Sequence, residues 1–546
     1  MPVPAYRGGV TELASRGASP REDWARAAEL IAALSLATDL GIGVSLEYGL
    51  QSTVVAMRLA ERMGVDAQTT SHTYYACLLF YIGCTATAGV AADLFGEDHA
   101  LTTYATPARF GSQSQMAAGM IRAIAPPGAA PVIRAVQLAR GLPKLAREFK
   151  GVVATTCEVG RMLSGRLGLP AAVSGLFAHV GERWDGKGEP GEVRGGEIPV
   201  PVRILHVARD AAFQRLLGGE QFAAGVIRER AGGAFDPEIA MRLVDDAPEI
   251  FALDDDRSAW EDVLAREPAP RLLLNGEAID RALAAMGEFA DLGSPYLVGH
   301  SGGVAELAAA AGQRCGLDNT DVVALRRAAL VHDLGRVAVP VRVWEKTAPL
   351  TVDDWERIRL HAYHSERILI HSPVLAALAP VATFHHERLD GSGYHRGAAT
   401  AALPMPARVL AAADAYHAMT EPRPHRAAHT PDQAAEALGA EARAGRLDPD
   451  AVSAVLEAAG QPVPRLERPA GLTDREAEVV GLLARGLQTK QVARVLDISV
   501  KTADRHVQNA YRKIGVSTRA GATLFGMQHG LLAWGELPMG KASSSS

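Results

Sequence analysis

Apolar residues recur at helical spacing along most of the chain. In 302–316, 320–335 and 353–371, alanine, valine, leucine and isoleucine return every three or four residues between charged positions. This period is that of an amphipathic α-helix with one face turned to a core. Glycine and proline interrupt the pattern at 191–201 and 397–406, which predicts connections between helices. We therefore expect an all-α fold.

One apolar stretch is long enough to suggest a different environment. Residues 73–92 contain no charged side chain and could cross a bilayer by their length. However, the stretch contains Gly83 and Gly89, and no basic cluster flanks it. We predict a buried core helix here, and no membrane partner for the protein.

The composition is that of a globular chain with ample core. Its 546 residues are 48% hydrophobic and 22% charged, enough for three or four domains of roughly 150 residues each. The net charge of −6 argues against a protein that coats nucleic acid with its whole surface, although a local basic surface remains open. The four cysteines form no C-x-x-C motif, and the N-terminus lacks an apolar segment after a basic start. We therefore expect a cytoplasmic protein without disulfides or a secretory signal.

The first 460 residues contain a long internal repeat. Gly64-Val65-Asp66 matches Gly316-Leu317-Asp318 at an offset of 252 residues. Further along, ERWDGKGEP (182–190) matches ERLDGSGYH (387–395) at an offset of 205. A repeat of this length is a whole domain rather than a solenoid unit. We predict two copies of one helical domain, a first copy at 22–255 and a second copy at 271–460.

Histidine and aspartate residues gather in the second copy, in adjacent pairs and at separated points. Imidazole suits iron, manganese and zinc, and a carboxylate can bridge two ions. Two such ions can activate a water and hold the oxygens of a phosphate ester. The candidate ligands are His300, His332, Asp333, His361, His385, His386 and Asp414. The matching positions of the first copy have lost all seven and hold Tyr48, Phe80, Tyr81, Thr156, Val180, Gly181 and Arg209.

These residues, with the strings VHDLGRVAVP (331–340) and HHERLDGSGYHRG (385–397), resemble the HD-GYP branch of the HD phosphohydrolase superfamily. Its best-known members hydrolyse cyclic di-GMP. The resemblance implies two divalent metal ions, iron, manganese or similar, bridged by Asp333. One ion would lie on His300, His332, Asp333 and Asp414, and the other on Asp333, His361, His385 and His386. It also gives Asp333 and Arg336 catalytic roles and implies substrate contacts from Gly393, Tyr394, Arg423 and Arg426.

Several positions depart from the family pattern. Tyr296 stands where some members have a glutamate for a third metal, so two ions are expected. Arg336 replaces a lysine and does not easily release a proton. His395 replaces the proline of the signature, and Ala427 replaces a lysine in a later phosphate-contacting segment. Hydrolytic chemistry is therefore better supported than any one nucleotide. Glu387 is expected to orient neighbouring groups, because metal-binding imidazoles need such partners.

A separate basic unit follows a proline-containing linker at 461–470. Its sequence resembles a LuxR-type helix-turn-helix, with Thr473 and Glu476 predicting a capping box. Between residues 470 and 533 there are nine lysine or arginine residues against five acidic ones, a local surplus that suits phosphate contact. The resemblance places the helix 500–513 in the major groove of DNA. It implies DNA contacts from Lys490, Lys501, Thr502, Arg505, Asn509 and Lys513.

Together these features predict a bacterial signalling regulator. The first copy would be a metal-free dimerisation or sensory platform, the second a metal-dependent phosphohydrolase, and 470–535 a DNA-binding domain. A phosphodiesterase acting on cyclic di-GMP or a related nucleotide second messenger is favoured. The alternative is a catalytically inactive, LuxR-type transcription factor gated by a nucleotide. Small readers of this type generally act as dimers, so we expect a homodimer.

Overall fold

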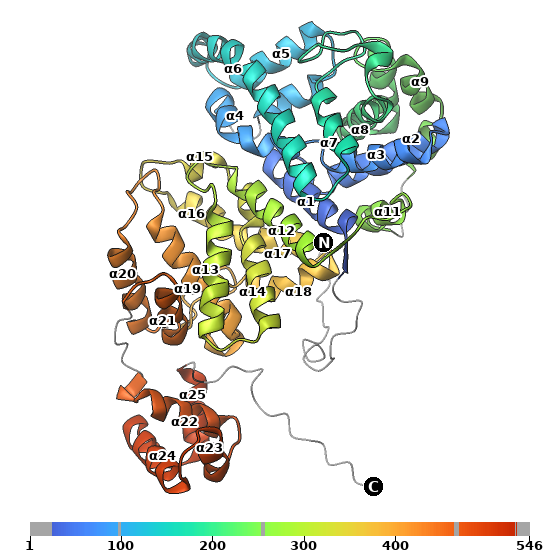
Figure 1. Ribbon diagram of the computed structural model, residues 1–546. Helices are drawn as coiled ribbons and strands as arrows, with labels where there is room; N and C mark the ends of the chain where they lie inside the picture. Colours follow the sequence, from blue (N-terminus) through green and yellow to red (C-terminus); the bar gives the residue numbers. More distant parts are fainter. Residues whose placement is uncertain (1–23, 97–99, 253–256, 463–468, 530, 532–546) are drawn as a thin grey trace.

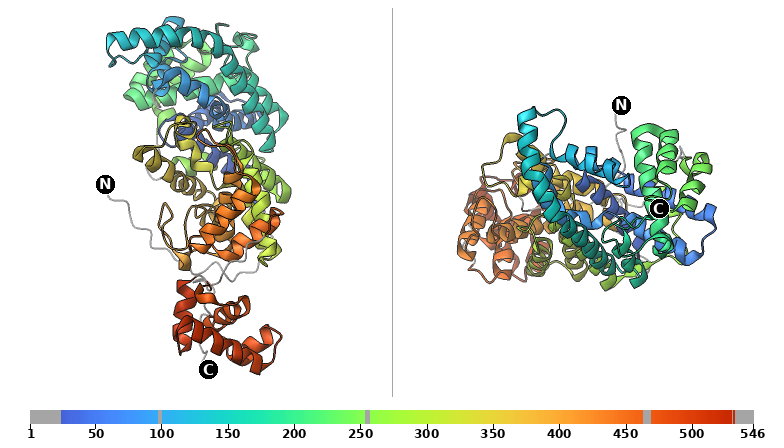
Figure 2. Two further views of the ribbon diagram at one scale, coloured as in Figure 1. Left: turned by 90° about the vertical axis from the view of Figure 1, so that its left-hand side faces the viewer. Right: turned by 90° about the horizontal axis from the view of Figure 1, so that it is seen from above.

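The protein is helical throughout, as predicted, except for one small β-ladder (Figure 1). The computed structural model describes residues 24–96, 100–252, 257–462, 469–529 and 531. The N-terminal segment 1–23, where no secretory signal is expected, lies outside the described residues, as does 463–468 of the predicted linker. Figures 1 and 2 show the first copy, the second copy and the C-terminal unit following one another in space as they do in the sequence.

The elements of the first copy alternate long helices with short 3₁₀ or π segments. They are β1 (Trp24–Arg26), α1 (Ala27–Ile42), α2 (Tyr48–Met63), α3 (Ala67–Leu78), η1 (Ile82–Thr87), α4 (Ala88–Phe95), η2 (Leu101–Ala105), η3 (Thr106–Ala108), α5 (Gln113–Ile124), α6 (Pro131–Arg166), α7 (Ala171–Leu176), η4 (Phe177–His179), η5 (Gly195–Glu197), α8 (Val200–Arg230), α9 (Pro237–Asp245) and α10 (Ala247–Phe251). Helix α11 (Ala259–Ala265) connects them to the second copy.

The second copy and the C-terminal unit complete the chain. The second copy has β2 (Leu273–Asn275), α12 (Gly276–Asp291), α13 (His300–Arg314), α14 (Asn319–Val331), η6 (Leu334–Ala338), α15 (Val341–Trp344), α16 (Val352–Arg359), α17 (His361–Leu369), α18 (Pro373–Ala382), η7 (Thr400–Ala402), α19 (Met405–Thr420), α20 (Pro431–Arg443) and α21 (Pro449–Ala458). The C-terminal unit has η8 (Pro469–Gly471), α22 (Asp474–Ala484), α23 (Thr489–Val495), α24 (Val500–Ile514) and α25 (Arg519–Gln528).

Matched buried ion pairs show that the repeat is structural. In the first copy, Arg203 donates to Asp236 at 2.8 Å, and in the second, Arg408 donates to Asp448 at 3.0 Å. Each aspartate also accepts from backbone N–H groups at the start of its helix, α9 or α21. Burying an arginine is tolerable only where its charge is paired. The same ion pair at matched positions indicates that the chain contains two copies of one domain fold.

Two glycines fix the same close approach in both copies. A methyl group added at Gly83 would lie 1.9 Å from the carbonyl oxygen of Thr156, and one at Gly335 would lie 2.2 Å from that of His361. Thr156 and His361 are themselves matched residues. Both glycines therefore let a 3₁₀ segment pack directly on a later helix, η1 on α6 and η6 on α17.

The two copies face each other across α1 and α12. Strand β1 pairs antiparallel with β2, with Ala25 opposite Leu274. Helix α1 is alanine- and leucine-rich, and nearly all of it is buried. It contacts η6 and α17 of the second copy, while α12 contacts η1 and α6 of the first. A helix that is apolar all round has to be enclosed, which explains why α1 lies between the two bodies in Figure 1.

The first copy has an insertion that the second lacks. Between Gly83 and Thr156 the offset falls from 252 to 205, so the first copy has 47 more residues in this interval. The interval contains α4, η2, η3, α5 and the N-terminal half of α6. These elements enclose a small apolar cluster of their own, which includes Leu94, Phe95 and Ile124.

The prediction of one buried helix at 73–92 is wrong in its geometry. Within the described residues, 67–95 is the one stretch long and apolar enough to cross a membrane, and about 56% of its most apolar window is buried in the protein. It is divided into α3, η1 and α4, because the chain must turn at Gly83 to pack against α6. Its first part is buried in the core, while α4 is only half-buried.

Candidate functional sites

The seven predicted ligands of the second copy converge on one carboxylate. The Oδ2 atom of Asp333 lies 3.1 Å from Nε2 of His332 and 3.5 Å from Nε2 of His300. Its Oδ1 atom lies 3.2 Å from Nε2 of His361 and 3.4 Å from Nε2 of His385. Each oxygen of Asp333 thus faces a different pair of imidazole rings. This is the arrangement that a bridging carboxylate needs.

Asp414 and His386 close the ring of candidate ligands. One oxygen of Asp414 lies 3.2 Å from Nε2 of His300, and the other lies 3.9 Å from Nδ1 of His386. Asp414 comes from α19, His300 begins α13, and His386 follows α18. Residues far apart in the sequence therefore meet because the helices that carry them pack side by side.

Three histidines are oriented by their own backbone. Nδ1 of each is hydrogen-bonded to the carbonyl oxygen three residues earlier: His332 to Ala329 at 2.7 Å, His385 to Ala382 at 2.7 Å, and His361 to Ile358. A proton on Nδ1 leaves Nε2 as a lone-pair donor, and a ligating histidine commonly has such a second partner. In each case Nε2 is the atom directed at Asp333.

The buried atoms at the centre fit a pair of cations. Nε2 of His300 and of His332 and Oδ1 of Asp333 are buried and form no hydrogen bond with the described residues. Buried polar atoms normally have partners. Neutral imidazole and carboxylate together are the donor set of divalent iron, manganese or zinc. The buried cluster is consistent with an HD-domain metal site.

The protonation preferences are divided across the cluster. Burial opposes charge on every member, but proximity to Arg336 and to the histidines holds the pKa of Asp333 well below its usual range. Burial also lowers the pKa of His332, but the neighbouring carboxylates of Asp333 and Asp414 outweigh this effect, so its pKa rises to about 9. Burial lowers the pKa of His385 to about 4 and that of His386 well below its usual range. At neutral pH the site therefore presents ionised carboxylates, a protonated His332 and the neutral imidazoles of His385 and His386. A metal ion bound there would displace the proton of His332.

Two residues beside the cluster were not predicted. Glu421 lies 3.0 Å from Nδ1 of His300 through one carboxylate oxygen and 3.3 Å from Nδ1 of His417 through the other. Burial raises its pKa, but contact with His300 and His417 lowers the net value to about 2. The signal was present in the sequence, because Asp414, His417 and Glu421 follow one helical face at spacings of three and four. His300, His417 and Glu421 also form a separate group with metal-ligand spacing.

The predicted catalytic and substrate residues differ in their placement. Arg336 contacts Asp333 with one guanidinium nitrogen, and its other two nitrogens are buried without a partner among the described residues. Tyr394 stacks on His386, with ring centroids 4.6 Å apart. Arg423 bonds to Glu421 at 2.8 Å, and burial together with nearby Arg336 lowers its pKa. These three residues therefore border the cluster.

Arg426 and Gly393 serve the local backbone. The Arg426 guanidinium donates to carbonyl oxygens at the end of α19, including that of Ala418 at 2.6 Å. A methyl group at Gly393 would lie 2.5 Å from the backbone of Glu387, so this glycine allows the loop to fold tightly. Glu387 itself accepts from the N–H groups of Arg396 and Ala398, so it holds this loop rather than an imidazole. Tyr296 is exposed and lies outside the candidate metal groups.

In the first copy the corresponding centre is filled by a cation and aromatic rings. The buried Arg209 guanidinium lies 4.8 Å from the ring centroid of Tyr48, 4.7 Å from that of Phe80 and 4.2 Å from that of Tyr81. The Tyr48 hydroxyl donates to the carbonyl oxygen of Arg209. These four residues occupy positions that match His300, His332, Asp333 and Asp414. A fixed cation thus stands where the second copy has carboxylate and imidazole.

The C-terminal unit has the predicted helix-turn-helix geometry. Thr473 and Glu476 form the capping box at the start of α22, and α24 follows a tight turn after α23. Helix α24 buries Ala503, Val507 and Ala510. Its opposite face carries the predicted contact residues Lys501, Thr502 and Arg505 in exposed positions, and Lys490 is exposed on α23.

Two predicted DNA contacts have partners inside the unit. Nζ of Lys513 donates to Glu476 at 2.6 Å and to the carbonyl oxygen of Gly471 at 2.9 Å. Asn509 is half-buried and accepts from Arg512. The ion pair of Lys513 ties α24 to the start of α22, so its placement differs from that of a free backbone-contacting lysine.

Comparison with known families agrees with both parts. A family described as "HD domain" matches residues 139–239 and 284–451, and one described as "Bacterial regulatory proteins, luxR family" matches 470–525. The chain therefore carries an HD domain of the HD-GYP-like phosphodiesterase type together with a C-terminal LuxR-family helix-turn-helix domain.

The chain is also similar in sequence to individual phosphodiesterases. It is 26% identical over 439 residues to the 3'3'-cGAMP-specific phosphodiesterase 3 of Vibrio cholerae, covering 79% of this chain and 94% of the relative. It is 35% identical to the cyclic di-GMP phosphodiesterase response regulator RpfG of Xanthomonas campestris, over 34% of this chain and 48% of that one. A crystal structure of V-cGAP3, a cyclic GMP-AMP specific phosphodiesterase of V. cholerae, shares the fold with a TM-score of 0.54, 22% identity and coverage of 80% and 98%.

Proposed function

We propose that the second copy is a metal-dependent phosphodiesterase of a cyclic dinucleotide and that the C-terminal unit binds DNA. The observation that carries the proposal is the division of the Asp333 oxygens between His300 and His332 on one side and His361 and His385 on the other. Divalent ions bound there would polarise the phosphodiester and activate water. Iron or manganese suits the mixed imidazole and carboxylate donors.

The protein's own groups supply position and charge. Asp333 would hold both ions, and Asp414 and His386 would complete their surroundings. The unpartnered nitrogens of Arg336 and the guanidinium of Arg423 form a cationic border that suits a phosphate. Tyr394, stacked on His386, places an aromatic ring beside the cluster. Arg426 remains a proposed substrate contact, and its N–H groups also donate to carbonyl oxygens at the end of α19.

Two cyclic dinucleotides, 3'3'-cGAMP and cyclic di-GMP, are the candidate substrates. One relative that matches both copies is named for 3'3'-cGAMP, whereas two relatives named for cyclic di-GMP match about a third of the chain. The match over both copies makes 3'3'-cGAMP the first substrate to test, with cyclic di-GMP second. The proposal includes a homodimer, since two-fold DNA sites are read by paired helix-turn-helix units. It also includes a cytoplasmic location.

The test is turnover by metal-loaded protein and its Asp333→Asn variant, with Asp390→Asn as a matched surface control. Asp390 lies on an exposed turn and bonds only to Ser392 among the described residues. Asp333→Asn is expected to lose metal and at least 100-fold of activity, and the control to keep both. Stoichiometric metal without cleavage of either dinucleotide would refute the enzyme and favour a regulator gated by nucleotide binding.

A further inference from the structure

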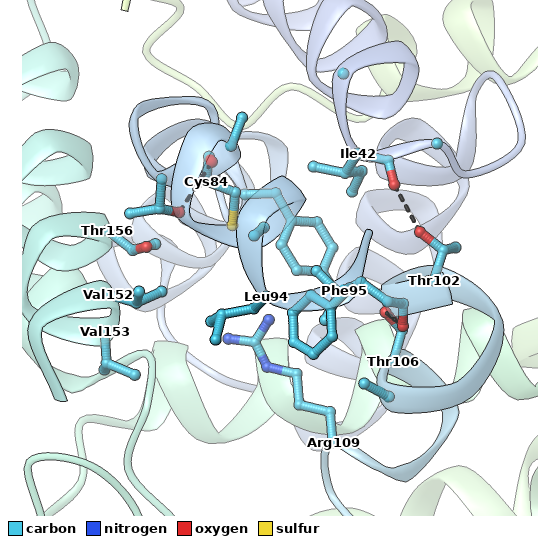
Figure 3. Close-up of a pocket in the computed structure, with 18 of the residues that line it drawn as sticks. Ile42, Cys84, Leu94, Phe95, Thr102, Thr106, Arg109, Val152, Val153 and Thr156 are labelled. Atoms are coloured by element: carbon cyan, nitrogen blue, oxygen red, sulfur yellow. Dashed lines mark hydrogen bonds between the residues drawn. The ribbon is translucent and has the colours of Figure 1, made fainter. Parts of the chain in front are cut away.

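The first copy contains a cavity of about 390 Å³ that lies where the second copy has part of its metal centre (Figure 3). Tyr81, Thr156, Val180 and Gly181 line it, and they match Asp333, His361, His385 and His386. The loop 187–189, which matches the loop of Gly393 and Tyr394, also lines it. The loss of the ligands has therefore left a space, and this size is typical of pockets that enclose a small molecule, roughly 300–1,000 Å³.

The insertion of the first copy provides the outer wall of this cavity. Side chains from α4, from 101–110, from α5 and from α6 surround it, and most of them are apolar. Leu94, Phe95, Val152 and Val153 are among those in Figure 3. The second copy, which keeps the candidate ligands, lacks these elements. Enclosure by an added segment indicates a cavity adapted for a ligand of its own.

The charges at the cavity are mostly positive. Among the described residues lining it, four are cationic and one, Glu189, is acidic. Arg183 is paired with Asp185 at 3.1 Å. Arg109 is different: its guanidinium lies over aromatic rings, 5.0 Å from the centroid of Phe80, and has no hydrogen bond or ion pair with a described side chain. Figure 3 shows Arg109 reaching into the cavity beside Leu94.

We infer that this cavity binds an amphipathic carboxylic acid, with its chain among the apolar residues and its carboxylate on Arg109. A carboxylate accepts paired hydrogen bonds from a guanidinium, and such charged bonds are strongest away from water. The apolar wall suits an aliphatic or aromatic body. The mostly apolar lining offers few partners for the base edges and sugar hydroxyls of a nucleotide.

One wall of the cavity belongs to the second copy. Val337 and Ala338 of η6, and Val341 of α15, line it. The same η6 segment contains Arg336, which contacts Asp333 of the candidate metal centre. A bound acid would therefore pack against the segment that follows Asp333. This contact gives a physical route by which the first copy could report a ligand to the second.

The test uses decanoate as the probe and the full-length protein, with binding measured by calorimetry. Val152→Trp and, independently, Ala91→Phe should fill the cavity and reduce decanoate affinity at least 10-fold. Ala154→Trp is the matched control, because Ala154 is exposed on the same helix and does not line the cavity. Arg109→Met should weaken decanoate about 10-fold while leaving decanol unchanged. Circular dichroism checks that each variant is folded.

Hydrogen exchange locates the bound probe. Decanoate should slow exchange in 337–342 of the wild type and of Ala154→Trp, but not of Val152→Trp. Equal decanoate binding by both folded cavity-filling variants and the control would overturn the inference. So would equal affinity for decanoate and decanol, absence of protection at 337–342, or displacement of decanoate by a cyclic dinucleotide that binds this cavity. None of these readouts depends on turnover, so they are independent of the proposed enzymatic activity.

Discussion

At the scale of single residues, orientation of the candidate ligands depends on neighbours that bind no metal themselves. Glu421 accepts from His300 where the other histidines use backbone carbonyls. Because removal of such a partner typically lowers metal affinity about 10- to 100-fold, Glu421→Ala should weaken metal binding by that factor in a chelator competition. Glu436→Ala, at an exposed position of α20, is the control. Equal affinities would show that His300 is held in place by packing alone.

A buried histidine of the first copy should make its stability depend on pH. Burial lowers the pKa of His206 to about 4 from an ordinary value of 6.5, and its Nε2 donates to the carbonyl oxygen of Val180 at 3.0 Å. Between these pH values the unfolded chain takes up a proton that the folded chain does not. The stabilisation is therefore complete above pH 6.5 and is lost as the pH falls toward 4, by up to about 3 kcal/mol.

The variant His206→Gln keeps an N–H donor but does not titrate. Urea unfolding of wild type and variant at pH 7 and pH 4.5 should show a smaller loss for the variant. If both proteins lose the same free energy of unfolding, His206 is not a source of the acid sensitivity.

Residue types and their order were sufficient to identify the seven candidate ligands. They did not predict the contacts between residues far apart in the sequence. The sequence placed Asp333 next to His332, yet only the packing of α13, α14, α17 and α19 shows how its two oxygens are divided. Lys513 illustrates the opposite problem. A lysine on a basic helix predicts a phosphate contact, while the nearby acidic residue that binds it, Glu476, is 37 positions away in the sequence.

At the scale of elements, the same glycine-dependent packing supports a metal centre in one copy and none in the other. A β-carbon at Gly335 or Gly83 would strike backbone atoms of α17 or α6, and overpacking of this kind costs about 1–3 kcal/mol. Gly335→Ala should move η6 away from His361 and lower metal content. Gly83→Ala should destabilise the first copy while metal remains bound.

Metal analysis and thermal unfolding of the two variants would separate these effects. Equal loss of metal in both would mean that the copies act as one unit through α1 and α12. The helical period predicted these elements well, but it could not show that 73–92 breaks at η1. That break depends on a contact with Thr156 of α6, 73 positions later and across the 47-residue insertion, so it has no local signal.

At the scale of the whole molecule, two different chemistries are carried by parts that the sequence distinguishes clearly. The metal-ligand set belongs to the second copy, and the local basic surplus belongs to the C-terminal unit. The resemblance identified both, whereas the cavity of the first copy could not be predicted, since its lining comes from segments between residues 40 and 342. The replaced ligands indicated a copy without metal chemistry, but they did not show that a cavity lies beside them.

DNA binding should be separable from the metal centre. Arg505 is exposed on α24 and bonds to no other side chain among the described residues, so Arg505→Ala should weaken DNA binding about 10-fold without unfolding the unit. A phosphate contact would lower the salt dependence of affinity by about one charge, whereas a base contact would relax sequence preference instead. Fluorescence anisotropy on a selected DNA site at several salt concentrations distinguishes these outcomes. Arg475→Ala is the control, because Arg475 lies on α22 and bonds to Glu478 and to the carbonyl oxygen of Leu496 rather than to α24. Circular dichroism checks that this variant keeps its fold. If Arg505→Ala and Arg475→Ala reduce affinity equally, α24 is not the recognition helix.

Because Arg505 and Asp333 lie in separate parts of the molecule, Arg505→Ala should leave the metal content unchanged. Any loss of metal would reveal a physical link between the two parts.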